Sequence, residues 1–143
     1  MNYRCMDIGD YDAVVKLWRS SNGISLREAD SREGILRYLT RNPGLSFVAE
    51  KDNEIIGTIM AGHDGRRGYV QHLAVCDMLR GQGIAGCLVE LCLQALKQHG
   101  ISKSHIHVLK RNHQGRQFWA RRGWFKREEV IMYSFINGDN PDV

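Results

Sequence analysis

The stretch that decides the fold is LAVCDMLRGQGIAGCL, residues 73–88. It begins with an apolar run, passes through a polar turn, and becomes amphipathic where Gly81, Gly83 and Gly86 lie. This order is typical of a buried strand that turns into a helix. The first N–H groups of a helix have no partner within it, and the helix dipole places partial positive charge there. Glycines let an anion approach that backbone closely, so the stretch predicts a phosphate cradle with Arg80 at its rim.

The glycine spacing alone does not identify the phosphate ligand. Gly81-x-Gly83-x-x-Gly86 matches the dinucleotide-binding fingerprint literally, but no acidic residue ends a second strand about 20 residues later, where the ribose contact belongs. An ATP-type P-loop is excluded because no Gly-Lys-Ser/Thr follows. A glycine-rich turn without any ligand remains as the alternative.

Two motifs carry a resemblance to a known family. Arg80-x-x-Gly83-x-Ala85 resembles the R/Q-x-x-G-x-G/A signature of the GNAT superfamily of acyl-CoA-dependent N-acyltransferases. Residues 112–124 read NHQGRQFWARRGW and are similar to the family's N-x-x-A-x-x-F/L-Y-x-x-x-G-F/Y segment, with Gly for Ala and Trp for Tyr. Residues 57–68, GTIMAGHDGRRG, further resemble the small bacterial YpeA-like branch, which does not define a substrate.

The resemblance implies that the ligand is acetyl-CoA. Backbone groups at the end of strand 69–75 would bind the pantetheine arm in a gap where this strand splays from strand 104–109. The glycine turn would hold the pyrophosphate, and Asn112 would contact the pantetheine or the adjacent helix start. The expected cofactor-binding residues are Leu73, Ala74, Val75, Arg80, Gly81, Gln82, Gly83, Ile84, Ala85, Gly86 and Asn112.

The whole chain reads as one α/β (α+β) domain over residues 1–143, with 137–143 as a frayed tail. Its 143 residues are 43% apolar and 25% charged, an ordinary globular balance. The expected order is β-α-α-β-β-β-α-β-α-β, with a mixed, mainly antiparallel sheet flanked by about four helices, which is also the topology that the resemblance implies. The expected strands are 2–6, 45–51, 54–62, 69–75, 104–109, 124–126 and 130–136, and the helices are 11–20, 30–41, 83–99 and 113–122. Asp10 is expected to cap the first helix, and Asp30 with Glu33 to form a capping box for the second.

Charge and composition limit the classes of partner that we expect. No apolar run approaches the roughly 18 residues of a membrane span, so we expect a cytoplasmic location and no membrane partner. The four cysteines form no Cys-x-x-Cys pair and are expected to be free thiols, with no metal site. The net charge of +4 suits a phosphorylated ligand, whereas the lack of a recognition motif or long basic stripe argues against nucleic acid. Homodimers are common among the proteins that the chain resembles.

Acyl transfer to an amine requires a neutral amine, a stabilised oxyanion and a proton for the leaving thiolate. The oxyanion donor is expected to be a backbone N–H near Leu73 and Ala74. In the family that the chain resembles, a Tyr of the second motif protonates the thiolate. Trp119 occupies that place, and an indole N–H has no useful acidity, so we interpret Trp119 as a packing residue. Tyr133 in the last expected strand is the alternative hydroxyl.

The general base stays open between several residues. The family often uses a position two or four residues before Leu73, which here means Gln71 or Tyr69. His72 has the opposite parity and is expected to point away from the cleft, as a core or helix-facing residue, unless a bulge resets it. In the branch that acetylates ribosomal-protein N-termini, the base corresponds to His107, whose reference pKa of about 6.5 suits a proton acceptor. Alternatively, His107 and its neighbour His105 simply line the polar face of their strand.

Two functions therefore follow from the sequence. The first is an acetyl-CoA-dependent N-acetyltransferase that acts on a primary amine of a small molecule or peptide, by direct transfer in a ternary complex, with His107 and Tyr69 as catalytic candidates. The second is a non-catalytic acyl-CoA-binding sensor, which the missing Tyr at position 119 favours. Acceptor specificity is expected to come from the two N-terminal helices, the connection 24–29 and the turn 63–68.

Overall fold

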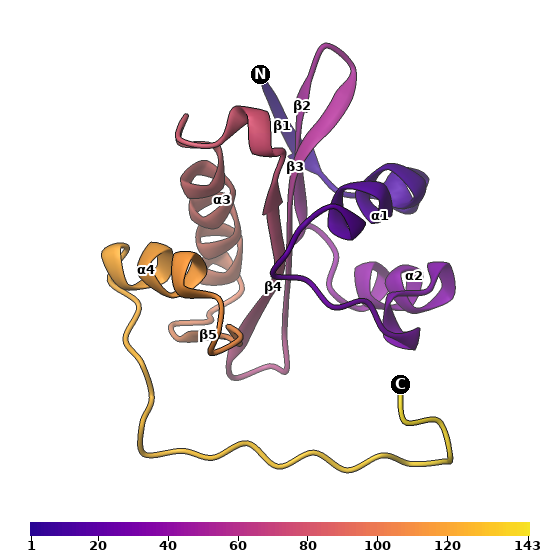
Figure 1. Ribbon diagram of the computed structural model, residues 1–143, viewed down its shortest axis with the longest axis vertical. Coiled ribbons are helices and arrows are strands. Elements are labelled where there is room, and N and C mark those ends of the chain that lie inside the picture. Colours follow the sequence, from indigo (N-terminus) through magenta and orange to yellow (C-terminus); the bar gives the residue numbers. More distant parts are fainter. The chain divides into compact units, whose positions relative to one another are not determined.

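The computed structural model describes residues 1–143, which form two compact units, Met1–His107 and Val108–Val143. The first unit contains a five-stranded sheet and three α-helices, α1 (Tyr11–Arg19), α2 (Arg32–Arg41) and α3 (Ile84–Gln98), as Figure 1 shows. The second unit contains one helix, α4 (His113–Arg121), followed by a long irregular segment. The expected α/β class with a mixed sheet and four helices is confirmed.

The strands of the sheet lie in the order of the chain, β1-β2-β3-β4-β5. The first four pair antiparallel with their neighbours, and β5 pairs parallel with β4. Short connections explain the antiparallel part, since a two-residue turn at Asp52 and Asn53 joins β2 to β3 with positive φ at both positions. Strand bounds are Asn2–Cys5 (β1), Phe47–Lys51 (β2), Glu54–His63 (β3), Gly68–Val75 (β4) and Ser104–Ile106 (β5).

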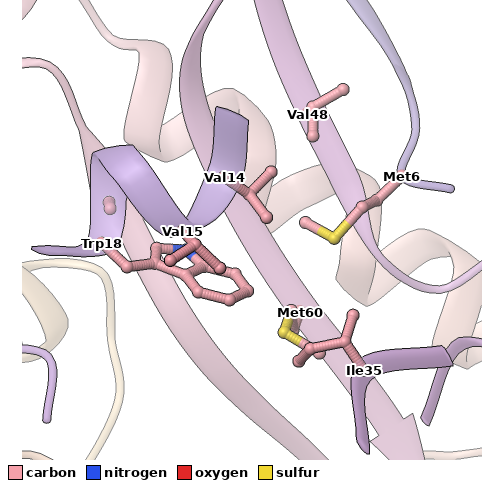
Figure 2. Close-up of a cluster of buried hydrophobic side chains, with 8 residues drawn as sticks. Met6, Val14, Val15, Trp18, Ile35, Val48 and Met60 are labelled. Carbon is pink, nitrogen blue, oxygen red and sulfur yellow. The ribbon is translucent and has the colours of Figure 1, made fainter. Parts of the chain in front are cut away.

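Different helices cover the two faces of the sheet (Figure 1). On one face, α1 and α2 form a cluster that Figure 2 shows in close-up, consisting of Met6, Val14, Val15, Trp18, Ile35, Val48, Met60 and Ala74. On the other face, α3 buries Ile84, Leu88, Val89, Cys92 and Leu96. At Gly57 of β3, an added Cβ would lie 3.2 Å from Leu88 Cδ1, so this glycine lets α3 approach the strand closely. Helices on both faces explain why β3 is buried nearly throughout.

The starts of the first two helices differ from expectation. Asp10 does not cap α1; its carboxylate accepts the Asp7 N–H at 2.9 Å and pairs with the Arg4 guanidinium, while a 3₁₀ turn, η1 (Ile8–Asp10), leads into the helix. Helix α2 is capped by Ser31, whose hydroxyl accepts the Gly34 N–H at 3.1 Å. The expected capping box of Asp30 is therefore wrong for α2. Asp10 instead pairs with Arg4 six positions before it, and Asp30 bonds His72, which is 42 positions away.

The C-terminal part also differs from expectation. Strand β5 ends at Ile106 rather than at 109, and no strand forms in residues 124–126 or 130–136. Apolar side chains of this segment are exposed, among them Phe125, Val130, Ile131, Met132, Tyr133, Phe135 and Ile136. An apolar run of this kind favours a strand, but a strand also needs a hydrogen-bonding neighbour, and this segment pairs with none in the structure.

Candidate functional site

The edge of β4 that faces β5 is covered by another strand only in its first part. Parallel pairing joins Gly68 to Ser104, Tyr69 to His105 and Val70 to Ile106, and it ends there. From residue 71 to residue 75, β4 has β3 on one side and no strand on the other. An edge of this kind presents backbone donors and acceptors that can bind an extended ligand. The three residues 73–75 expected to bind the pantetheine lie on this edge.

A β-bulge interrupts β4 at the same place. Thr58 pairs with Ala74 and Met60 with Gln71, so His72 and Leu73 together face Ile59 of β3. His72 has φ +50°, a left-handed conformation that is uncommon for a non-glycine residue. Bulges of this kind change the direction of a side chain and end the regular ladder, often beside functional sites. From the sequence, His72 was expected to point away from the cleft unless a bulge changed its direction, and such a bulge is present.

The glycine turn has the geometry of an anion cradle. Gly81 and Gly83 have φ +79° and +81°, and Gly83 is the N-cap of the 15-residue helix α3. No side chain caps this helix, no acidic residue lies in its first turn, and nothing lies within 4 Å of a Cβ added at either glycine. A phosphate group therefore fits this helix start in both charge and space. Arg80 is about half exposed and pairs with Asp77 at 2.9 Å at the rim of the turn.

The two catalytic candidates from the sequence lie at different places. Tyr69 is half-buried on β4, and its ring centroid lies 5.8 Å from that of His105, its partner on β5. His107 follows the last residue of β5 and is exposed, so it lies outside the strand in which it was expected. The structure thus brings Tyr69 together with His105, whereas His107 lies beyond the end of the strand.

In the second unit, the residues of the second motif serve helix α4. Asn112 is its N-cap, and the side-chain oxygen accepts the Gly115 N–H at 2.9 Å. The Asn-x-x-Gly spacing is therefore the spacing of a helix cap. Trp119 is buried, and its ring packs edge-on against Trp124 at 4.7 Å and Phe118 at 5.1 Å. These contacts agree with the interpretation of Trp119 as a packing residue.

Sequence reasoning missed the partner of His72. Its Nε2 lies 2.7 Å from Asp30 Oδ1, on the 3₁₀ turn η2 (Glu28–Asp30) between α1 and α2. Burial would raise the pKa of Asp30, but hydrogen bonds from His72 and from the Arg27 N–H outweigh it and hold this pKa below its usual range. The pair spans 42 positions, and no local pattern marks it. The ring also packs against Trp18 at 4.7 Å, so His72 does face α1, as expected for a helix-facing residue.

Two further features of the whole chain bear on its chemistry. No group of three or more His, Cys, Asp or Glu side chains is arranged to hold a metal ion. None of the helices combines the length and the apolar character that crossing a membrane requires.

Comparisons with known proteins agree with this geometry. The sequence model described as "Acetyltransferase (GNAT) family" matches residues 11–124. An acetyltransferase of Pectobacterium atrosepticum is 36% identical over 113 residues, which cover 78% of this chain and 79% of that protein. An acetyltransferase of Photorhabdus laumondii is 36% identical over 112 residues, which cover 78% of each chain.

Solved structures show the same fold at lower identity. The PaiA N-acetyltransferase of Thermoplasma acidophilum, in complex with coenzyme A, superposes with a TM-score of 0.78 at 22% identity, covering 91% of this chain and 92% of that one. The aminoglycoside 6′-N-acetyltransferase of Acinetobacter haemolyticus has a TM-score of 0.78 at 18% identity, covering 96% of this chain and 100% of that one.

Proposed function

The chain belongs to the acetyltransferase (GNAT) family, which uses acetyl-CoA, and we propose that it transfers the acetyl group to a primary amine. The observation that carries the proposal is the continuity of residues 71–86. An open strand edge, a bulge, a turn with two positive-φ glycines and an uncapped helix start follow one another there. An extended ligand with an amide-bearing arm and a phosphate-bearing end needs an open strand edge for the arm and a helix start for the phosphates.

The residues present fit acetyl-CoA. Leu73, Ala74 and Val75 would hydrogen-bond the pantetheine arm through their backbone, and residues 80–86 would hold the pyrophosphate. Asn112 is proposed as a further pantetheine contact through the part of its side chain that does not cap α4. When bound, acetyl-CoA supplies a thioester carbonyl that a neutral amine can attack. A backbone N–H near Leu73 and Ala74 would stabilise the oxyanion.

We propose direct transfer in a ternary complex, with no acetylated cysteine. Burial raises the pKa of the Cys92 thiol to about 12, which keeps this thiol protonated at neutral pH. Cys5, Cys76 and Cys87 are also free, and no histidine is hydrogen-bonded to any of the four thiols. His107 and Tyr69 remain candidates for proton transfer, on the resemblance stated above.

The proposed acceptor is a primary amine of a small molecule or peptide. PaiA and the aminoglycoside 6′-N-acetyltransferase share the fold and act as N-acetyltransferases by name, which supports an amine acceptor. Helix α1 and the turn η2 lie beside the β4 bulge through Trp18 and Asp30, so we propose that the acceptor is recognised there. The second candidate is a non-catalytic acyl-CoA sensor, favoured by Trp119 at the place of the family's acidic Tyr.

Cofactor binding is tested by comparing Gly83→Glu with Gly100→Glu. These glycines flank α3, have φ +81° and +82°, and have no atom within 4 Å of an added Cβ, so both changes introduce the same strain and charge. In isothermal titration with acetyl-CoA and CoA, we expect Gly83→Glu to weaken binding by about 100-fold or more, because the added carboxylate repels the pyrophosphate. Gly100→Glu should bind as the wild type does. Equal affinity in the two variants would contradict the cradle.

Turnover separates an enzyme from a sensor. The wild-type protein is incubated with acetyl-CoA and a panel of amines (spermidine, tyramine, kanamycin and a lysine-containing peptide with a free N-terminus), and release of the CoA thiol is followed. We expect thiol release that depends on at least one amine. A protein that binds CoA but releases no thiol above the amine-free rate would be a sensor.

A further inference from the structure

A polar network holds the bulge of β4 from two sides, and its Trp18–Thr58 hydrogen bond is buried. From the side of β3, the Thr58 hydroxyl donates to the His72 carbonyl at 2.9 Å and accepts from Trp18 Nε1 at 2.9 Å. From the side of the α1–α2 connection, Asp30 bonds the His72 ring. Asp30 is itself held by the Arg27 N–H at 2.9 Å, and its carbonyl accepts from the Tyr11 hydroxyl at 2.7 Å. The Asp30 bond holds the imidazole itself, and the other bonds hold the His72 backbone, Thr58 and Asp30 in place.

The pairing determines which nitrogen of His72 is open. The depressed pKa of Asp30 means that its carboxylate is ionised at neutral pH and can only accept a hydrogen bond. His72 Nε2 must therefore carry the proton and donate it to Asp30, which leaves the lone pair of the neutral ring on Nδ1. The His72 ring makes its hydrogen bond through Nε2, and Nδ1 makes none. Nδ1 is not a buried atom without a partner, since the atom of that kind is Tyr38 Oη. The His72 side chain is 15% exposed, so Nδ1 is accessible.

The groups that face the His72 ring come from three elements of the fold. Asp30 faces it from η2, Trp18 packs against it from α1, and β3 contributes the neutral Thr58. Arg27 lies three positions before Asp30 and binds its carboxylate through the backbone N–H, and the Arg32 guanidinium lies over the Tyr11 ring at 5.8 Å from its centroid. The Asp30 carboxylate therefore contacts the ring directly and orients it.

We propose that His72, oriented by Asp30, is the proton acceptor for the acceptor amine, which binds over the α1–α2 connection beside the β4 bulge. This role rests on the proposed function. His72 directly precedes Leu73 and Ala74, where the oxyanion donor is expected, so base and oxyanion site lie on adjacent residues. It would be a catalytic residue, and Asp30 a positioning residue that acts through it.

The proton balance of the step is complete. The amine nitrogen forms a bond to the carbonyl carbon, and the C–S bond breaks. The proton that leaves the nitrogen goes to His72 Nδ1, and the electron pair of the C–S bond leaves with the CoA thiolate. The resulting imidazolium is stabilised by the Asp30 carboxylate across the 2.7 Å contact and can return its proton to the thiolate or to water. Neither Trp119 nor a carboxylate on β4 is needed.

The test compares His72→Gln and Asp30→Asn with His99→Gln as the matched control. His99 is an exposed histidine at the C-terminal end of α3, the end opposite the glycine turn. For each protein, CoA affinity is measured by isothermal titration, and kcat/KM is measured from pH 5.5 to 9 with the most active amine of the panel above. We expect His72→Gln to lower kcat/KM by about 100-fold or more while CoA affinity stays within about threefold. His99→Gln should match the wild type in both.

The pH profile separates a base from a merely structural histidine. The acid limb of the wild-type profile reports protonation of His72, so it should disappear in His72→Gln. Asp30→Asn removes the carboxylate that orients the ring and faces the imidazolium formed in the step, so the plateau rate should fall while the acid limb remains.

The outcomes distinguish this role from the proposed function. A His72→Gln variant with wild-type kcat/KM and an unchanged acid limb would overturn the role of His72 and leave the acetyltransferase intact. A loss of rate matched by an equal loss of CoA affinity or of thermal stability would make His72 a structural residue and would also overturn it. A wild-type protein that binds CoA without any amine turnover would overturn both proposals.

Discussion

At the scale of single residues, Arg4 connects three segments of the first unit. Its guanidinium donates two hydrogen bonds to the Asp10 carboxylate, at 2.7 and 2.9 Å, and a third to Glu50 on β2. Burial would raise the pKa of Asp10, but the Arg4 hydrogen bond and the Asp7 N–H outweigh it and lower this pKa. The sequence predicts Asp10 as a helix cap, whereas its carboxylate forms a partly buried ion pair with Arg4.

Replacing Asp10 by Asn should lower the free energy of unfolding by about 2 kcal/mol at pH 7, because it leaves Arg4 without its bidentate partner. The pKa of Asp10 is lower in the folded state than in the unfolded one. Its stabilisation is therefore present above the unfolded pKa and is lost as the pH falls through the folded pKa. Urea denaturation at a series of pH values should show that the stabilities of wild type and variant converge in acid.

The control Glu33→Gln removes an exposed pair at 3.4 Å and should change stability by less than about 0.5 kcal/mol. An Asp10→Asn effect that is constant with pH would contradict the assignment.

At the scale of elements, local chemistry sets the turns and helix ends. The hairpin between β2 and β3 turns at Asp52 and Asn53, with φ +52° and +63°, and these are the two residues that separate the expected strands 45–51 and 54–62. Helix α3 runs from Ile84 to Gln98, within one residue of the expected range, between two positive-φ glycines, Gly83 and Gly100. These features depend on residues a few positions apart, so sequence alone predicts them well.

Asn53→Gly should stabilise the hairpin by about 0.5 kcal/mol, because glycine adopts a positive φ without the steric cost of a Cβ. Asn53→Val should destabilise it by about 1 kcal/mol, because a β-branched residue fits this conformation poorly. Thermal and urea denaturation measure both changes. If the two variants moved stability in the same direction, the turn geometry would be wrong.

At the scale of the whole molecule, the segment after α4 is the exception to ordinary burial. Ile131, Tyr133 and Phe135 are 79%, 90% and 87% exposed, in an apolar run that the sequence analysis expected to be a strand. Contiguous exposed apolar surface of this kind drives association between proteins. The homodimer expected from the family resemblance therefore stays a prediction, with this segment as the surface to test.

We expect the wild-type chain to self-associate, and the double variant Ile131→Lys, Tyr133→Lys to shift toward monomer, because two charges replace exposed apolar side chains. Size-exclusion chromatography with light scattering measures the mass over a range of protein concentrations. The melting temperature should stay within about 2 °C, since neither side chain contributes to a core. Val143→Lys, which changes an exposed apolar residue at the chain end, outside the apolar run 130–136, is the control. A wild-type monomer at every concentration would contradict the prediction.

The fold class, most helix and strand ranges, the hairpin and the glycine turn were determined by the sequence itself. Their physical basis is local, since the periods of 3.6 and 2, the helix caps and the positive-φ positions depend on neighbours in the chain. Only the tertiary structure decided the partners of Arg4, Asp10 and Asp30, the bulge at His72 and the end of the β4–β5 pairing at Ile106. The contact between Asp30 and His72 joins positions 42 residues apart, and the one between Arg4 and Glu50 joins positions 46 apart. In the Asp30 contact the carboxylate accepts a local backbone N–H and also binds a distant side chain, and only the sheet register brings that side chain into reach.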